Sequence, residues 1–216
     1  MNAPTTDAGY RRTNTLLDLT CIFDSQVQVA SWPRPLQPEV QTYLAEAARL
    51  GRLGQGLRQR LAWDQPPDLS DLPDLPGRPA LAKEVAELCM LYGDLLGCPY
   101  IGMRIEVVEG AMCPRFHVDR TGIRLVCTWR GSGTEWLDDA RLDRSRLGIG
   151  SGGTPDEESG LLPADITIHQ ADNFELVLLK GSLWQGNQGQ GAIHRSPAVV
   201  PEHSPRVLIA LDALWE

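Results

Sequence analysis

Between residues 100 and 108 the sequence reads Tyr-Ile-Gly-Met-Arg-Ile-Glu-Val-Val, which has the β-branched, apolar composition and the length of a strand. Further stretches of similar composition follow, each bounded by Gly, Pro, Asp or Asn: 123–129, 164–168, 174–179 and 207–211. No helical pattern separates these stretches. Residues 99–216 are therefore predicted to form a β-core with mainly antiparallel strands.

Two helical patterns precede this run of strands. Residues 36–63 place apolar side chains on one side of a helix, although the glycines at 51, 54 and 56 favour a break in its second half. After a proline-rich loop at 64–79, a second helix is predicted from Pro79 to Leu96, and Gly97 is a natural end for it.

The order of these patterns predicts one globular unit of the α+β class, mainly β with helices at the N-terminal side. Residues 1–20 are expected to be a flexible tail, and residues 21–98 a helical layer packed on the β-core. Residues 99–216 are expected to carry the functional site. Strands that follow a separate block of helices do not favour an alternating βαβ sheet.

Composition excludes several classes of function. The net charge of -8 disfavours binding to nucleic acid, because an acidic surface repels phosphate backbones. No signal-peptide pattern begins the chain, and no apolar run is long enough to span a bilayer, so neither secretion nor a membrane partner is expected. The five cysteines fit free thiols in the cytoplasm, the expected compartment.

The strongest candidate for chemistry is a His-x-Asp pair. Residues 113–120 read Cys-Pro-Arg-Phe-His-Val-Asp-Arg, and on a strand His117 and Asp119 would project to the same side. One imidazole and one carboxylate supply two ligands for a divalent metal. Among the four histidines of the chain, His194 is the best third ligand because it ends a polar loop shortly before the last strand.

Two histidines and one carboxylate on one face of a metal ion leave positions open for oxygen and a bidentate cosubstrate, as non-haem iron(II) oxygenases require. The far carboxylate of 2-oxoglutarate would then need a cation. Arg206, twelve residues after His194 at the start of the last strand, is the first candidate. Arg124 is the competing anchor because it also begins a strand, and Arg104 is a weaker rival.

At these residues the sequence resembles the iron(II)/2-oxoglutarate-dependent oxygenases, in particular the prolyl hydroxylases. His117, Asp119, His194 and Arg206 match in order the family pattern of His-x-Asp/Glu, a distant His and a later Arg or Lys. The resemblance covers residues 100–216 and includes several strand-like segments: 103–110, 124–129, 133–136 and 165–174.

This resemblance implies a double-stranded β-helix, or jelly-roll barrel, with the helices buttressing one sheet. It also implies an enzyme that holds iron(II), uses 2-oxoglutarate and hydroxylates a substrate, either a small molecule or a protein or peptide side chain. The chain as a whole is similar to an uncharacterised bacterial family, the domain of unknown function numbered 1826, which implies no particular activity.

Two alternatives stay open. The same three ligands would suit zinc(II) in a cupin-like metal-binding or metal-homeostasis protein without turnover, and Cys113 could then join His117 as a zinc ligand. A metal-free binding barrel would make the His-x-Asp pair incidental. His169 and His203 lack a carboxylate at metal-ligand spacing and are expected to be ordinary polar residues.

Overall fold

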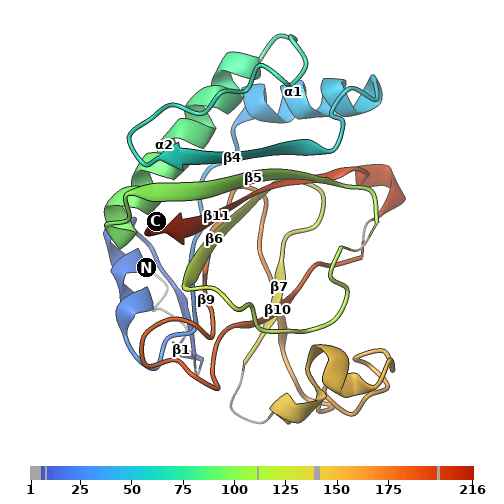
Figure 1. Ribbon diagram of the computed structural model, residues 1–216. Coiled ribbons are helices and arrows are strands. Elements are labelled where there is room, and N and C mark those ends of the chain that lie inside the picture. The colour runs from blue at the N-terminus through green and yellow to red at the C-terminus, as the bar shows by residue number, and fades with distance from the viewer. Residues whose placement is uncertain (1–5, 8, 111, 139–141, 199) are drawn as a thin grey trace.

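The computed structural model describes residues 6–7, 9–110, 112–138, 142–198 and 200–216 (Figure 1). Within these residues the strands form two sheets, and the chain is mostly β. The larger sheet has eight strands in the order β1 (Thr6–Asp7), β2 (Tyr10–Arg12), β3 (Val29–Trp32), β9 (Leu176–Lys180), β6 (Ile123–Arg130), β11 (Arg206–Leu214), β5 (Tyr100–Val108) and β4 (Gly56–Ala62).

The larger sheet is mixed. Strands β2 and β3 pair in parallel, whereas the other neighbouring strands pair antiparallel. The smaller sheet is antiparallel, and its described strands lie in the order β10 (Ile193–Arg195), β7 (Glu135–Leu137) and β8 (Ile168–Gln170). A single bridge between His117 and His194 extends this sheet beyond β10.

The helices α1 (Pro38–Arg49) and α2 (Arg78–Leu96) lie on the side of the larger sheet away from β7 and β10 (Figure 1). Because side chains alternate along a strand, β5 presents Ile101, Met103 and Ile105 to this helical side. These residues share one apolar core with helix residues such as Leu81 and Leu88.

The opposite face of the larger sheet meets the smaller sheet. Val126, Leu179 and Leu208 pack there in a second apolar cluster with Trp136 of β7. The larger sheet therefore separates a helix-covered core from the space between the two sheets. Among the described residues, no helix is long and apolar enough to cross a membrane.

Several predicted elements are confirmed. The strand predicted at 100–108 is β5, the strand predicted at 123–129 covers all of β6 except its last residue, and the strand predicted at 207–211 lies in the first part of β11. Helix α2 ends at Leu96, and Gly97 adopts the left-handed backbone conformation, with φ of 63°, that favours glycine at a helix end.

The prediction of a helix through residue 63 is wrong in its second half. Helix α1 ends at Arg49, and residues 56–62 form β4 at the edge of the larger sheet. Gly56 has φ of 86°, and a Cβ there would lie 2.0 Å from the carbonyl oxygen of Ile105. This close approach of β4 to β5 is possible only for a residue without a side chain.

The expected division of the N-terminal part also needs correction. The stretch 21–98 contributes β3 and β4 to the larger sheet and is not purely a helical layer. The expected tail at 1–20 is partly built into the fold, because β2 pairs with β3 and a 3-10 helix begins at Leu17. The strand predicted at 164–168 is displaced, since β8 begins only at Ile168.

Candidate metal centre

The backbones of His117 and His194 pair directly at the edge of the smaller sheet. Each amide donates to the carbonyl oxygen of the other residue, and both distances are 3.0 Å. This pairing brings the ring centroids to 4.5 Å from one another. Asp119 follows two residues after His117, and the ligand atoms of the three side chains all lie within 4.8 Å of one another. Residues distant in sequence thus form one cluster.

Both imidazoles are held in the orientation that a metal ligand requires. The Nδ1 atom of His117 lies 2.8 Å from the carbonyl oxygen of Arg115, and that of His194 lies 3.0 Å from the carbonyl oxygen of Ala192. Because a carbonyl oxygen only accepts hydrogen bonds, each Nδ1 carries the proton. Each Nε2 is therefore left with its lone pair available for a metal ion.

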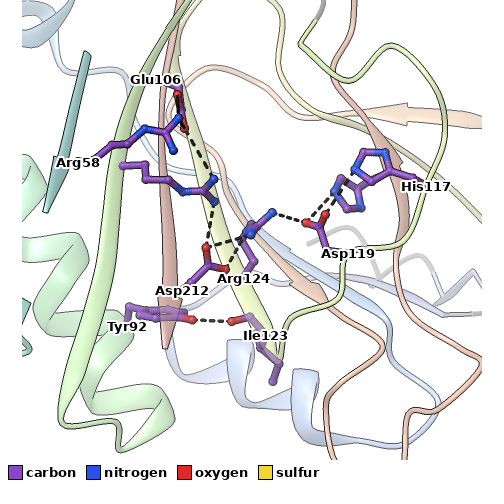
Figure 2. Close-up of polar contacts among 10 residues, drawn as sticks. Arg58, Tyr92, Glu106, His117, Asp119, Ile123, Arg124 and Asp212 are labelled. Atoms are coloured by element: carbon purple, nitrogen blue, oxygen red, sulfur yellow. Dashed lines mark hydrogen bonds and ion pairs between the residues drawn. The ribbon is translucent and has the colours of Figure 1, made fainter. Parts of the chain in front are cut away.

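The two Nε2 atoms face the carboxylate of Asp119. His117 Nε2 lies 3.4 Å from Oδ1, and His194 Nε2 lies 3.3 Å from Oδ2 (Figure 2). Two neutral imidazoles and a carboxylate would direct lone pairs at one another, an arrangement that becomes favourable when a proton or a metal ion lies between them. The donor set fits a divalent cation.

The protonation properties of the cluster agree with this arrangement. The hydrogen bond with Asp119 raises the pKa of His117, and this effect outweighs burial, which lowers it. Burial alone would raise the pKa of Asp119, but the hydrogen bonds that His117 and His194 donate when their Nε2 atoms are protonated, together with the charge of Arg124, bring it well below its ordinary value. Asp119 is therefore ionised at neutral pH, as a metal ligand must be.

Arg124 lies beside the candidate ligands and is fully engaged. Its Nη1 donates to Asp119 Oδ2, while Nε and Nη2 donate to the two carboxylate oxygens of Asp212 at 2.8 and 3.0 Å (Figure 2). Burial would lower the pKa of Arg124, but the hydrogen bonds that it donates to Asp212 raise it overall. Its charge is already balanced by two carboxylates of the chain.

Arg206 differs from Arg124 in its hydrogen-bond partners, which are hydroxyl groups and not carboxylates. It is only 2% exposed, and its guanidinium donates to three hydroxyl groups: Ser196 Oγ at 2.7 Å, Thr134 Oγ1 at 3.0 Å and Thr128 Oγ1 at 3.2 Å. Among the described residues, its Nε has no hydrogen-bond partner and no carboxylate forms an ion pair with its guanidinium. Burial lowers the pKa of Arg206 to about 10. A buried cation without a counter-ion favours binding of an anion.

One cavity of about 130 Å³ connects these groups. Its walls include His117, Asp119 and His194, and both Arg124 and Arg206 line it as well. Thr134 and Ser196 also belong to the lining, which extends the candidate site beyond the residues that the sequence indicated. Ser196 follows His194 by two residues, so strand alternation could have pointed to it, whereas Thr134 carried no recognisable signal.

The remaining candidates lie outside the three-residue cluster. Arg104 donates to Asp212 at 2.9 Å and is engaged like Arg124. Cys113 is exposed and lines the cavity, but it does not belong to the group of potential ligands found among the described residues. His169 lies 3.2 Å from Asp138, away from the cluster. The side chain of His203 lies outside the described part of the structure.

Comparison with known proteins identifies the family. The model of the family described as "Protein of unknown function (DUF1826)" matches residues 13–212, so the chain belongs to this family. No curated protein matches the chain. The predicted similarity to that uncharacterised family is confirmed, and the family description itself names no activity.

Solved structures show what the fold resembles. A full-length Neurospora crassa protein, solved in complex with alpha-KG, has a TM-score of 0.50 and 11% identity over 99% of this chain and 88% of that one. A Pseudomonas putida prolyl-4-hydroxylase has a TM-score of 0.46 and 14% identity over 94% of this chain and 95% of that one. HygX from Streptomyces hygroscopicus, solved with iron bound, has a TM-score of 0.43 and 14% identity over 92% of this chain and 86% of that one. The predicted resemblance in fold to the iron(II)/2-oxoglutarate oxygenases is confirmed.

Proposed function

We propose that this protein is an iron(II)/2-oxoglutarate-dependent oxygenase with a double-stranded β-helix core, in which His117, Asp119 and His194 hold the metal. The observation that carries the proposal is a combination within one cavity. Three convergent ligand side chains lie in the same cavity as Arg206, a buried cation that has no carboxylate partner among the described residues. A site that only stores a metal ion has no need for such a cation.

The three ligands suit iron(II) because they occupy only part of its coordination sphere. Two imidazole nitrogens and one carboxylate oxygen leave positions for a bidentate cosubstrate and for oxygen. The carbonyl oxygens of Arg115 and Ala192 fix the ring orientations of His117 and His194, which reduces the reorganisation needed when a metal ion binds. When bound, the iron and 2-oxoglutarate would supply the oxidising power for hydroxylation.

Arg206 is the proposed anchor for the far carboxylate of 2-oxoglutarate. A guanidinium attracts a carboxylate by its charge and its N–H donors, and among the described residues the Nε of Arg206 has no hydrogen-bond partner. Thr128, Thr134 and Ser196 accept from its other nitrogens and keep the guanidinium in place. Arg124 is the weaker candidate for this role because Asp119 and Asp212 already bind it.

The zinc alternative uses the same three ligands but gives Arg206 no function.

The substrate of the proposed oxygenase is a small molecule or a protein or peptide side chain that reaches the cavity near His117. This side chain is 27% exposed, the largest fraction among the three candidate ligands. His117 thus marks the side on which the cluster meets solvent.

The proposal is tested by anaerobic titration of the metal-free protein with iron(II) and 2-oxoglutarate. Chelation of iron by the cosubstrate gives a visible charge-transfer band, which is the expected result. Titration with 2-oxoglutarate in the absence of iron is the control and should give no band. A missing band in the complete mixture, together with tight zinc binding, would overturn the oxygenase assignment and favour a metal-binding protein.

A further inference from the structure

A row of alternating charges crosses the cavity side of the larger sheet and ends at the candidate metal ligand (Figure 2). Three arginines alternate with three carboxylates along this row, in the order Arg58, Glu106, Arg104, Asp212, Arg124 and Asp119. They come from β4, β5, β11 and β6, and from the loop that holds Asp119. The formal charges of the row cancel.

The inner end of the row has the most restrictive geometry. Asp212 and Arg124 are opposite each other on neighbouring antiparallel strands, β11 and β6. Two nitrogens of Arg124 bind the two oxygens of Asp212, which fixes the plane of the guanidinium. Arg104 donates to Asp212 at 2.9 Å from the other side, so the Asp212 carboxylate is held between two arginines.

This arrangement directs the remaining nitrogen of Arg124 at Asp119. Nη1 donates to Oδ2, while Oδ1 lies nearest to His117. Asp119 comes from a loop without regular strand pairing, and the hydrogen bonds and ion pairs of its side chain among the described residues are with Arg124, His117 and His194. Before any metal ion binds, Arg124 is therefore the fixed cationic contact of this carboxylate.

We propose that Arg124 is a positioning residue that holds Asp119 in its ligand orientation, and that Asp212 acts through Arg124 by fixing the guanidinium. This inference rests on the proposed metal centre and assigns a task to residues that do not ligate the metal. Asp212 balances the charge of Arg124, so the orienting effect remains while repulsion between the arginine and a metal cation is largely offset.

The orienting role of Arg124 and its positive charge predict opposite changes in metal affinity when Arg124 is replaced. Removing a cation from the neighbourhood of a metal site strengthens metal binding by Coulomb's law. Removing the group that orients a ligand weakens it, typically by about 10- to 100-fold. The pair Arg124→Gln and Arg124→Lys separates the two effects, because lysine keeps the charge but loses the two-point hold on Asp212.

The experiment measures cobalt(II) affinity and the cobalt d–d absorption spectrum in the full-length protein, without any turnover. We expect at least about tenfold weaker binding in both Arg124 variants, with an altered d–d spectrum in the bound state. Arg58→Gln is the matched control, since it removes an ion pair at the far end of the row from an arginine that is 68% exposed. Its affinity should equal that of the unmodified protein.

A double-variant comparison tests the role of Asp212. Asp212→Asn should weaken cobalt binding, because Arg124 is then free to pair with Asp119 through two nitrogens and compete with the metal. In the Arg124→Gln background, Asp212→Asn should have little further effect on cobalt affinity, because the arginine through which Asp212 acts on Asp119 is no longer present. Thermal unfolding of each metal-free variant separates a loss of folded protein from a loss of affinity.

Two results would overturn the inference and leave the proposed function intact. The first is cobalt binding by Arg124→Gln that is as tight as, or tighter than, binding by the unmodified protein. The second is a full additive effect of Asp212→Asn in the Arg124→Gln background. Failure of the unmodified protein to bind cobalt(II), iron(II) or zinc(II) would instead remove the metal centre itself, and with it both proposals.

Discussion

Arg206 Nη2 donates to Thr134 Oγ1 at 3.0 Å, and this bond links β11 of the larger sheet to the residue that precedes β7 of the smaller sheet. Ser196, which follows β10, accepts from Nη1 of the same guanidinium at 2.7 Å. Both sheets therefore hold Arg206 before any ligand arrives. A guanidinium fixed in this way loses little further conformational entropy when it binds a carboxylate.

Arg206→Gln should weaken 2-oxoglutarate binding by about 30-fold or more, the effect of removing one partner of a buried charge pair. Metal affinity should stay within about twofold, because Arg206 contacts none of the three candidate ligands. The measurement is an anaerobic titration of the iron(II)-loaded protein with 2-oxoglutarate, in which the absorbance of the charge-transfer band reports binding. If Arg206→Gln kept its cosubstrate affinity while Arg124→Gln lost it, Arg124 would be the anchor.

His117→Ala should abolish metal retention. The remaining imidazole and carboxylate would supply only two protein ligands, and two ligands are too few for a stable site. Metal analysis of protein purified without a histidine tag and then dialysed against iron(II) or zinc(II) gives the readout. His169→Ala is the control, because His169 pairs with Asp138 outside the cluster, and this variant should retain metal. Equal metal content in the two variants would contradict the assignment of His117.

Metal affinity should fall as the pH decreases through the raised pKa of His117, because a proton and a metal ion compete for Nε2. Stability of the metal-free protein should respond in the opposite direction. The pKa of His117 is higher in the folded state, so its contribution is fully present below the unfolded value of about 6.5 and is lost as the pH rises through the folded value.

Cobalt(II) titrations and urea unfolding at several pH values between about 6 and 8 check both trends. His117→Gln should remove this part of the pH dependence of stability in the metal-free protein. A cobalt affinity that stayed constant over this range would show that no imidazole of the cluster is a ligand.

A buried ion pair joins helix α2 to the segment between β3 and α1, and its loss should lower the stability of the fold. Glu84 on α2 is 1% exposed and binds Arg34 at 2.5 and 3.2 Å, and it also accepts from Trp129 Nε1 at 3.1 Å. Arg34→Met would leave a buried carboxylate without its cation, so we expect a loss of about 3–5 kcal/mol in the free energy of unfolding.

Urea unfolding measures this loss. Adding Glu84→Gln to Arg34→Met should recover part of it, because a neutral amide can still accept from Trp129 and carries no unpaired charge. A double variant less stable than Arg34→Met alone would show that the ion pair is not the source of the stability.

Gly133 should tolerate no side chain. A Cβ at this position would lie 2.0 Å from the carbonyl oxygen of Ala171, so one of the two chain segments would have to move. Gly133→Ala is expected to cost about 1–3 kcal/mol of stability. Gly133→Ala should also weaken the binding of 2-oxoglutarate more than the binding of metal, since the neighbouring Thr134 accepts a hydrogen bond from Arg206.

The control for this variant is Gly110→Ala, because a Cβ at Gly110 would meet no atom within 4 Å. Its stability should change by less than about 0.5 kcal/mol. Thermal unfolding and the charge-transfer titration give the two readouts. If Gly133→Ala weakened the binding of cosubstrate and of metal equally, the displacement of the chain at Gly133 would not act through Thr134.

The wrong helix at 56–62 shows where local pattern stops being informative. Leu57 and Leu61 are the buried residues of β4, and their separation of four fits one face of a helix as well as one face of a strand. Pairing of β4 with β5 decides between the two, and this pairing joins residues far apart in the chain. By contrast, β5 and α2 have patterns long enough to be unambiguous.

The amino-acid sequence was sufficient to predict the elements whose periodicity is local, and it identified His117, Asp119, His194 and Arg206 as candidates from residue type and order. Only the tertiary structure brought His194 beside His117, through backbone pairing between distant segments. It also distinguished the two arginines, because Asp212 lies 88 residues from Arg124 and binds it, whereas the hydrogen bonds of Arg206 to the described side chains all go to hydroxyl groups. Local sequence sets the face on which a side chain projects, but long-range strand pairing decides which charges meet across the sheet.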